Sequence, residues 1–179
     1  MDDSYFSQFL ADPTPENFDS LRNAQLQSGY APYSGELEGI DQQLQESRFE
    51  EVVERIKKAM SPNFLLSPSV HLKLAAAYEG LGATEKSEVE RAIGVTLLKG
   101  IRETGKGTPE EPYRVTTTTD EYDLLFFEQL EFESQSLREV NGKRMDVIRT
   151  KDGREVWFDV GDLFATVKQR LIAKNEAAK

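Results

Sequence analysis

The spacing of apolar residues changes once along the chain, and this change constrains the fold more than any other feature. In the first part, apolar residues recur three and four positions apart, as Leu37, Ile40 and Leu44 do, which is the spacing of one helix face. In the second part, β-branched runs are joined by Asn141-Gly142 and Asp152-Gly153, dipeptides that tolerate the positive φ of tight hairpins. We therefore predict an α+β fold, with antiparallel helical hairpins followed by a small sheet.

Capping residues and prolines predict where the helices of the first part begin. Thr14-Pro15 and Ser67-Pro68 each place a capping residue before a proline at the first helical position. A 35-residue shift aligns residues 47–52 with residues 82–87, which is close to the 34-residue period of tetratricopeptide repeats. We predict degenerate tetratricopeptide-like hairpins, with an unrelated helical bundle as the alternative.

The second part predicts the element order β-α-β-β-β-α. We expect a strand over residues 113–118 and a short helix over 120–129, opened by a capping box of Thr118 and Glu121. An antiparallel meander follows, and Asp162 is positioned to cap a last helix. The helix over 120–129 is apolar almost all round, so we expect it to be buried on more than one side. The predicted regions are 1–107 and 108–179, which could also form one continuous domain.

The excess negative charge is confined to the first third of the sequence. Residues 1–54 carry twelve acidic side chains against Arg22 and Arg48, whereas the remaining residues carry 20 of each sign. A negative field repels nucleic-acid phosphates and attracts basic partners. The sequence therefore predicts a basic protein partner and no nucleic acid, although an acidic surface that only maintains solubility is the alternative.

Composition also predicts a cytoplasmic protein without a membrane segment. The apolar runs are far shorter than a transmembrane helix, and the first residues do not resemble a secretory signal. The chain has no cysteine, which removes disulfides, thiolate metal sites and thiol nucleophiles.

No motif in the sequence predicts catalysis or a cofactor. Gly100 to Lys106 has the spacing of a phosphate loop, but Gly107 stands where that motif needs Ser or Thr. His71 is the only histidine, and we expect it to pack between helices. Clustered carboxylates such as those around Asp120 fit helix-start electrostatics as well as chemistry. We predict no catalytic residue, no metal site and no cofactor.

Two groups of side chains are candidates for contacting a partner. Tyr30 and Tyr33 flank a proline in a loop, and tyrosine frequently anchors interfaces, although packing on the core is the alternative for both. The acidic residues Glu50, Glu51 and Glu54 fall on one predicted helix, where they would steer a basic segment.

Six segments are informative when they are read together, namely residues 12–14, 29–33, 104–108, 120–122, 145–147 and 157–160. In their order and rough spacing they resemble an uncharacterised bacterial family, domain of unknown function 4919. The resemblance implies the architecture and no activity. It also implies that Tyr30, Tyr33, Glu121 and Tyr122 belong to one structural or binding feature, in which we include Asp120. Lys106 and Asp120 depart from residues frequent in that family.

These observations favour a non-enzymatic protein–protein interaction module whose acidic helical surface binds a basic partner. Two alternatives stay open. An acidic protein could neutralise a basic toxin, as immunity proteins do, or convergent carboxylates could form an enzyme active site.

Overall fold

The computed structural model describes the backbone of residues 3–177 and the side chains of residues 4–170 and 172. The first part contains α1 (Asp3–Ala11), α2 (Pro15–Gln27), α3 (Ile40–Gln45), α4 (Phe49–Ala59), a short π-helical turn η1 (Met60–Phe64), α5 (Pro68–Gly80) and α6 (Thr84–Glu103). The second part contains β1 (Tyr113–Arg114), α7 (Thr119–Phe127), β2 (Phe132–Val140), β3 (Lys143–Thr150), β4 (Glu155–Asp159) and α8 (Gly161–Ala177). This is the predicted α+β class, with the predicted order β-α-β-β-β-α.

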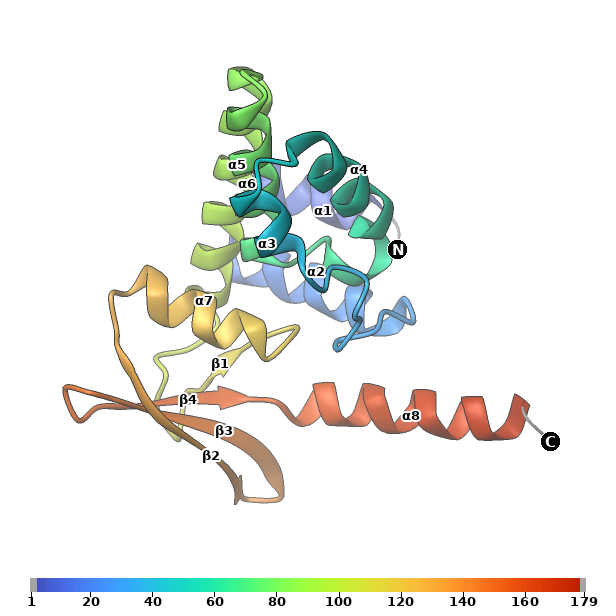
Figure 1. The fold of residues 1–179 in the computed structure, drawn as a ribbon. Helices are drawn as coiled ribbons and strands as arrows, with labels where there is room; N and C mark the ends of the chain where they lie inside the picture. Colours follow the sequence, from blue (N-terminus) through green and yellow to red (C-terminus); the bar gives the residue numbers. More distant parts are fainter. Residues whose placement is uncertain (1–2, 178–179) are drawn as a thin grey trace.

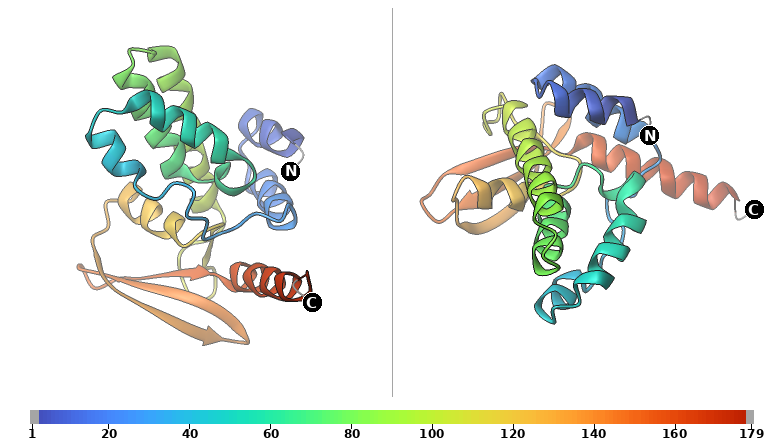
Figure 2. Two further views of the ribbon diagram at one scale, coloured as in Figure 1. Left: turned by 45° about the vertical axis from the view of Figure 1, so that its right-hand side comes forward. Right: turned by 90° about the horizontal axis from the view of Figure 1, so that it is seen from above.

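The helices stack above the sheet, and α8 extends from the end of β4 past α2 (Figures 1 and 2). Two predicted helix starts are confirmed: α2 begins at Pro15 and α5 begins at Pro68. The Oγ1 atom of Thr14 accepts a hydrogen bond from the backbone N–H of Asn17 at 3.3 Å, as an N-cap should. Helix α1 was not predicted. The tetratricopeptide-like relationship stays a prediction.

The sheet has the strand order β1-β4-β3-β2, with β1 parallel to β4 and the other neighbours antiparallel. The predicted meander is confirmed. Asn141 and Gly142 have φ values of 53° and 74°, which is the backbone that a two-residue hairpin needs.

Three local predictions are wrong because side chains bond to unexpected partners. The strand predicted over residues 113–118 has only two residues, since the N–H groups of Thr116 and Thr117 donate to the Asp120 carboxylate. Thr118 makes no side-chain cap bond, so the capping box does not form. Asp162 does not cap α8 either: α8 begins at Gly161, and the Asp162 carboxylate pairs with Arg22.

One apolar cluster joins both predicted regions, because helices α1, α2 and α6 pack on α7 and on the inner face of the sheet. Its members include Phe9, Phe18, Leu21, Leu97, Ile101, Leu124, Ile148 and Phe158. Gly100 allows a close approach in this packing, because a Cβ atom there would meet the Phe18 ring at 2.5 Å and the Phe9 ring at 2.8 Å. A second cluster holds α4 against α5 through Val52, Ile56, Val70, Leu74 and Ala77.

Candidate functional site

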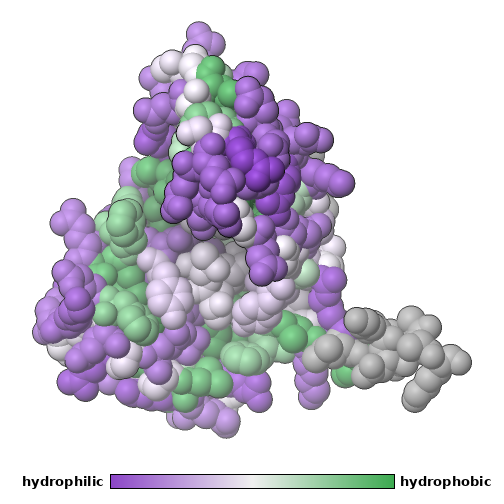
Figure 3. Space-filling view, in the orientation of Figure 1, coloured by the Kyte–Doolittle hydropathy of each residue, from purple (hydrophilic) through white to green (hydrophobic). Residues whose placement is uncertain are grey.

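An apolar groove lies between α5, α6 and α7. Its volume is about 890 Å³, and Leu44, at the end of α3, closes one side. The other lining residues are Ser69, Leu72, Lys73, Ala76, Val95, Leu98, Asp123, Phe126, Phe127, Gln129, Leu130 and Glu131. Figure 3 shows apolar surface beside α7, next to the hydrophilic surface of the upper helices. We refer to this feature as the α7 groove.

Phe126 is the most exposed aromatic residue among the large exposed apolar side chains, at 86%. Leu124 and Leu125 turn toward the core, which leaves Tyr122 and Phe126, four positions apart, on the opposite side of α7. Tyr122 is 41% exposed. The prediction that α7 is buried on more than one side is confirmed, since Asp120, Glu121, Leu124 and Leu125 are all buried. The exposed face was not predicted, and Phe126 is a site residue that the sequence did not indicate.

Asp123 and Lys73 are two of the charged side chains that line the α7 groove. The Asp123 carboxylate accepts a hydrogen bond from the backbone N–H of Ser69 at 3.1 Å. Burial, followed by the charge of Asp120, raises the pKa of Asp123 to about 6. The Lys73 ammonium pairs with Asp41 at 2.9 Å. These groups can orient a ligand, while the surrounding side chains provide apolar area.

The predicted acidic contact residues Glu50, Glu51 and Glu54 are all exposed on α4, on the side opposite its buried residues Val52 and Ile56. Glu51 forms an ion pair with Arg48. The three glutamates thus share a solvent-facing surface, and they are not lining residues of the α7 groove.

The two candidate tyrosines have different surroundings. Tyr30 is fully buried, and its hydroxyl donates to the carbonyl oxygen of Thr116 at 2.6 Å. Burial is the main cause that raises the pKa of the Tyr30 hydroxyl. Tyr30 is therefore a core residue and is not open to a partner, because its ring packs in the cluster shared by both regions. Tyr33 is 57% exposed.

The structure brings together most of the residues that the family resemblance grouped. Burial first, then the charges of Glu121 and Asp146, raises the pKa of the Tyr33 hydroxyl, so both acids act electrostatically on Tyr33. The Tyr122 hydroxyl donates a hydrogen bond to Oε1 of Gln135. Asp120 has other hydrogen-bond partners, because its carboxylate bonds to Thr116 and Thr117 in the preceding loop.

Two acids meet between α7 and the sheet. The Gln135 amide donates to Oε2 of Glu121 at 3.2 Å and to Oδ2 of Asp146 at 2.9 Å. Burial, with the charges of Asp146 and then Asp120, raises the pKa of Glu121 to about 9. Such shifts are typical of general acids, but Glu121 is 0% exposed, so a substrate cannot reach this carboxyl group without opening the packing.

The remaining sequence candidates have structural partners. His71 bonds through Nδ1 to Glu90 at 2.7 Å and through Nε2 to the carbonyl oxygen of Leu65 at 2.9 Å. Lys106, in the segment with phosphate-loop spacing, pairs with Glu111 at 2.9 Å. Over the described residues, no cluster of three or more histidine or acidic side chains could hold a metal ion.

Comparisons with known proteins return no match, neither to a family model, nor to a curated protein, nor to a solved structure. The resemblance to domain of unknown function 4919 stays a prediction. Within the described part of the chain, every helix is too short or too polar to cross a membrane.

Proposed function

We propose that this protein is a non-enzymatic binding module that holds an amphipathic helix of a partner protein in the α7 groove. The observation that carries the proposal is Phe126, whose side chain is 86% exposed beside a groove of about 890 Å³. Helix-in-groove recognition uses apolar anchors at every third or fourth position of the bound helix. Aromatic side chains at the centre of an interface frequently contribute much of the binding energy.

Charge complementarity favours a partner helix that also carries basic residues. The whole chain has a net charge of −10, and the α7 groove contains Asp123 and Glu131 against the single cation Lys73. Glu50, Glu51 and Glu54 add an exposed acidic surface on α4. A negative field of this kind raises the association rate of a basic partner more than it changes the final affinity.

Replacement of Phe126 with serine is expected to weaken binding at least tenfold, since loss of an aromatic anchor costs about 2 kcal/mol or more. Peptides would be selected from a displayed random library on the wild-type protein. Their affinities would be measured by fluorescence anisotropy for the wild type, Phe126→Ser and a control, Leu137→Ser. Leu137 is 53% exposed on β2, outside the α7 groove.

The selected peptides should have apolar residues three and four positions apart, with lysine or arginine between them. The proposal fails if selection yields no such peptides, or if Phe126→Ser and Leu137→Ser have equal affinities for them. Because Phe126 is almost fully exposed, its replacement should leave the thermal melting temperature nearly unchanged.

Reversing Glu50, Glu51 and Glu54 to lysine is expected to slow association with the selected peptides several-fold at low salt and to change dissociation little. Stopped-flow fluorescence at two ionic strengths would measure both rates. The control is a triple reversal of the exposed residues Glu110, Glu133 and Glu139, which has the same change in net charge. Equal effects of both triple variants would show that only total charge matters and that the α4 surface has no special role.

A further inference from the structure

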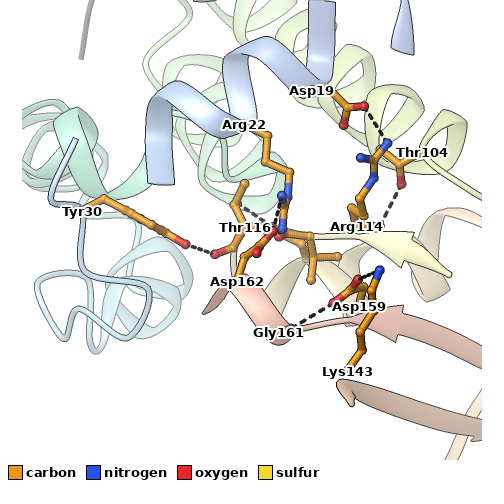
Figure 4. Close-up of polar contacts among 12 residues, drawn as sticks. Asp19, Arg22, Tyr30, Thr104, Arg114, Thr116, Lys143, Asp159, Gly161 and Asp162 are labelled. Carbon is orange, nitrogen blue, oxygen red and sulfur yellow. Dashed lines mark hydrogen bonds and ion pairs between the residues drawn. The ribbon is translucent and has the colours of Figure 1, made fainter. Parts of the chain in front are cut away.

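A basic pocket of about 510 Å³ lies where α2, β1, the β2–β3 turn, the end of β4 and the start of α8 meet. It is separate from the α7 groove, and the two share no lining residue. Figure 4 shows Arg22 reaching from α2 to Asp162 at the start of α8, with Arg114 and Lys143 nearby. The charged residues that line the basic pocket are Arg22, Arg114, Lys143, Arg144, Lys168, Asp159 and Asp162.

The basic pocket has an excess of positive charge in an otherwise acidic protein. Five cations line it against two acids, and a third acid, Asp19, neutralises Arg114 from outside at 2.6 Å. The local excess is therefore about two positive charges, whereas the chain as a whole is at −10. Clustering of like charges is unfavourable unless an anion offsets it.

Two of the cations form no ion pair within the described residues. The Arg144 guanidinium lies over the Phe164 ring, 4.8 Å from its centroid, and Lys168 is exposed on α8. A third cation, Lys143, has a long contact of 3.6 Å with Asp159. These side chains are available to bind an anion.

Arg22 supplies an independent indication of a ligand. It is 2% exposed, and its Nε and Nη1 atoms donate to the carbonyl oxygen of Val115 at 3.1 Å and to Asp162 at 2.9 Å. Its Nη2 atom is buried with no hydrogen-bond partner among the described residues. A buried N–H without an acceptor is unfavourable, and an oxyanion oxygen is the acceptor that a guanidinium group binds best.

We propose that the basic pocket binds a small phosphate-bearing molecule. A phosphate monoester carries a charge of about −1.5 to −2 at pH 7, which matches the local excess, whereas a monocarboxylate would leave one positive charge. The start of α8 lines the pocket, and the positive end of its dipole also favours an anion. The volume exceeds that of a phosphate group, so Phe164 and Ala165 would contact the organic part. This inference does not depend on the proposed function.

Isothermal titration at low ionic strength would test the proposal with inorganic phosphate, ribose 5-phosphate and succinate as probes. We expect saturable one-site binding of the phosphates, and at least tenfold weaker binding by Arg144→Gln/Lys168→Gln, since each substitution removes a charged donor of a hydrogen bond to the phosphate. The control is Lys57→Gln/Lys58→Gln, which removes two exposed cations from α4 and should change affinity less than about twofold.

The relative affinities identify the source of the phosphate. Tighter binding of ribose 5-phosphate assigns the pocket to a phosphate ester, and equal or tighter binding of inorganic phosphate assigns it to the free ion. The proposal is overturned if neither phosphate binds saturably, if succinate binds as tightly as both, or if the two double variants lose equal affinity. Arg144 and Lys168 are exposed, so their replacement tests binding without removing packing from the core.

Discussion

Replacing Glu121 with glutamine is expected to stabilise the protein at pH 7.5 by roughly 4 kcal/mol, taking 1.36 kcal/mol for each unit by which the pH exceeds the unfolded pKa. The Glu121 carboxyl group is fully buried, and its Oε1 atom has no partner among the described residues. Its Oε2 atom accepts only the 3.2 Å hydrogen bond from Gln135. Glutamine keeps this acceptor and the shape of the side chain, but it cannot ionise.

The sign of this effect follows from the pKa of Glu121, which burial and the neighbouring charges of Asp146 and Asp120 raise from 4.5 to about 9. Below pH 4.5 both the folded and the unfolded states bind the proton, so ionisation carries no cost. Between pH 4.5 and 9 only the folded state binds it, so the free energy of unfolding falls as the pH rises. Above pH 9 both states are ionised, and the loss is complete.

Urea denaturation at pH 5, 6, 7 and 8 would measure the difference between the wild type and Glu121→Gln. We expect similar stabilities near pH 5 and a gap that widens with pH. The control, Glu139→Gln, changes an exposed glutamate on β2 and should follow the wild type. Parallel curves for the wild type and Glu121→Gln would mean that the buried carboxyl group ionises without a penalty.

Glu121→Gln and its control Glu139→Gln also test the alternative that convergent carboxylates form an enzyme active site. A general acid with a raised pKa would lose its chemistry on conversion to glutamine, whereas a structural carboxyl group would leave a more stable protein with intact peptide binding. Since Glu121 has no exposed surface, we expect the second result.

Local signals explain which parts of the fold could be predicted from the sequence. Asn141-Gly142 specifies a hairpin within four residues, and the proline at position 15 or 68 sets a helix start in the same local way. Each depends on backbone preferences that hold in almost any tertiary context. The predicted meander and the element order of the second part are therefore confirmed.

The candidate site could not be predicted, because it depends on which faces of α7 meet other elements. Phe126 and Leu125 are adjacent and similarly apolar, yet one is 86% exposed and the other 3%. No local pattern separates them. The basic pocket likewise joins Arg22 to residues about 140 positions later in the chain. At Asp120 a side chain competes with the predicted strand, because its carboxylate accepts hydrogen bonds from the backbone N–H groups of Thr116 and Thr117.

Replacement of Asp120 with alanine is expected to destabilise the protein by about 3–5 kcal/mol, because it leaves buried polar groups without acceptors. Asp120 is 0% exposed. Its Oδ2 atom accepts from the backbone N–H groups of Thr116 and Thr117 at 2.8 and 2.9 Å and from Oγ1 of Thr116 at 2.7 Å. Its Oδ1 atom accepts from Oγ1 of Thr117 at 3.0 Å.

Urea denaturation would measure this loss, with Asp120→Asn and Asp41→Ala for comparison. Asparagine keeps one acceptor oxygen, so its loss should be intermediate. Asp41 is paired with Lys73 at the surface, and such pairs contribute at most about 1 kcal/mol. If Asp120→Ala lowers the free energy of unfolding by less than about 1 kcal/mol, the Asp120 carboxylate has no structural role.

The loop that Asp120 holds also determines where the α7 groove forms. Residues 115–118 join β1 directly to α7, and the Tyr30 hydroxyl fixes the same loop by donating to the carbonyl oxygen of Thr116. With both attachments in place, Leu124 faces the core and Phe126 faces solvent. Asp120→Ala should therefore weaken peptide binding even under conditions in which the chain stays folded. Without this attachment, α7 is no longer held in one orientation about its own axis. Phe126→Ser, by contrast, should weaken binding with no loss of stability, and this contrast separates the residue that positions the groove from the residue that contacts the ligand.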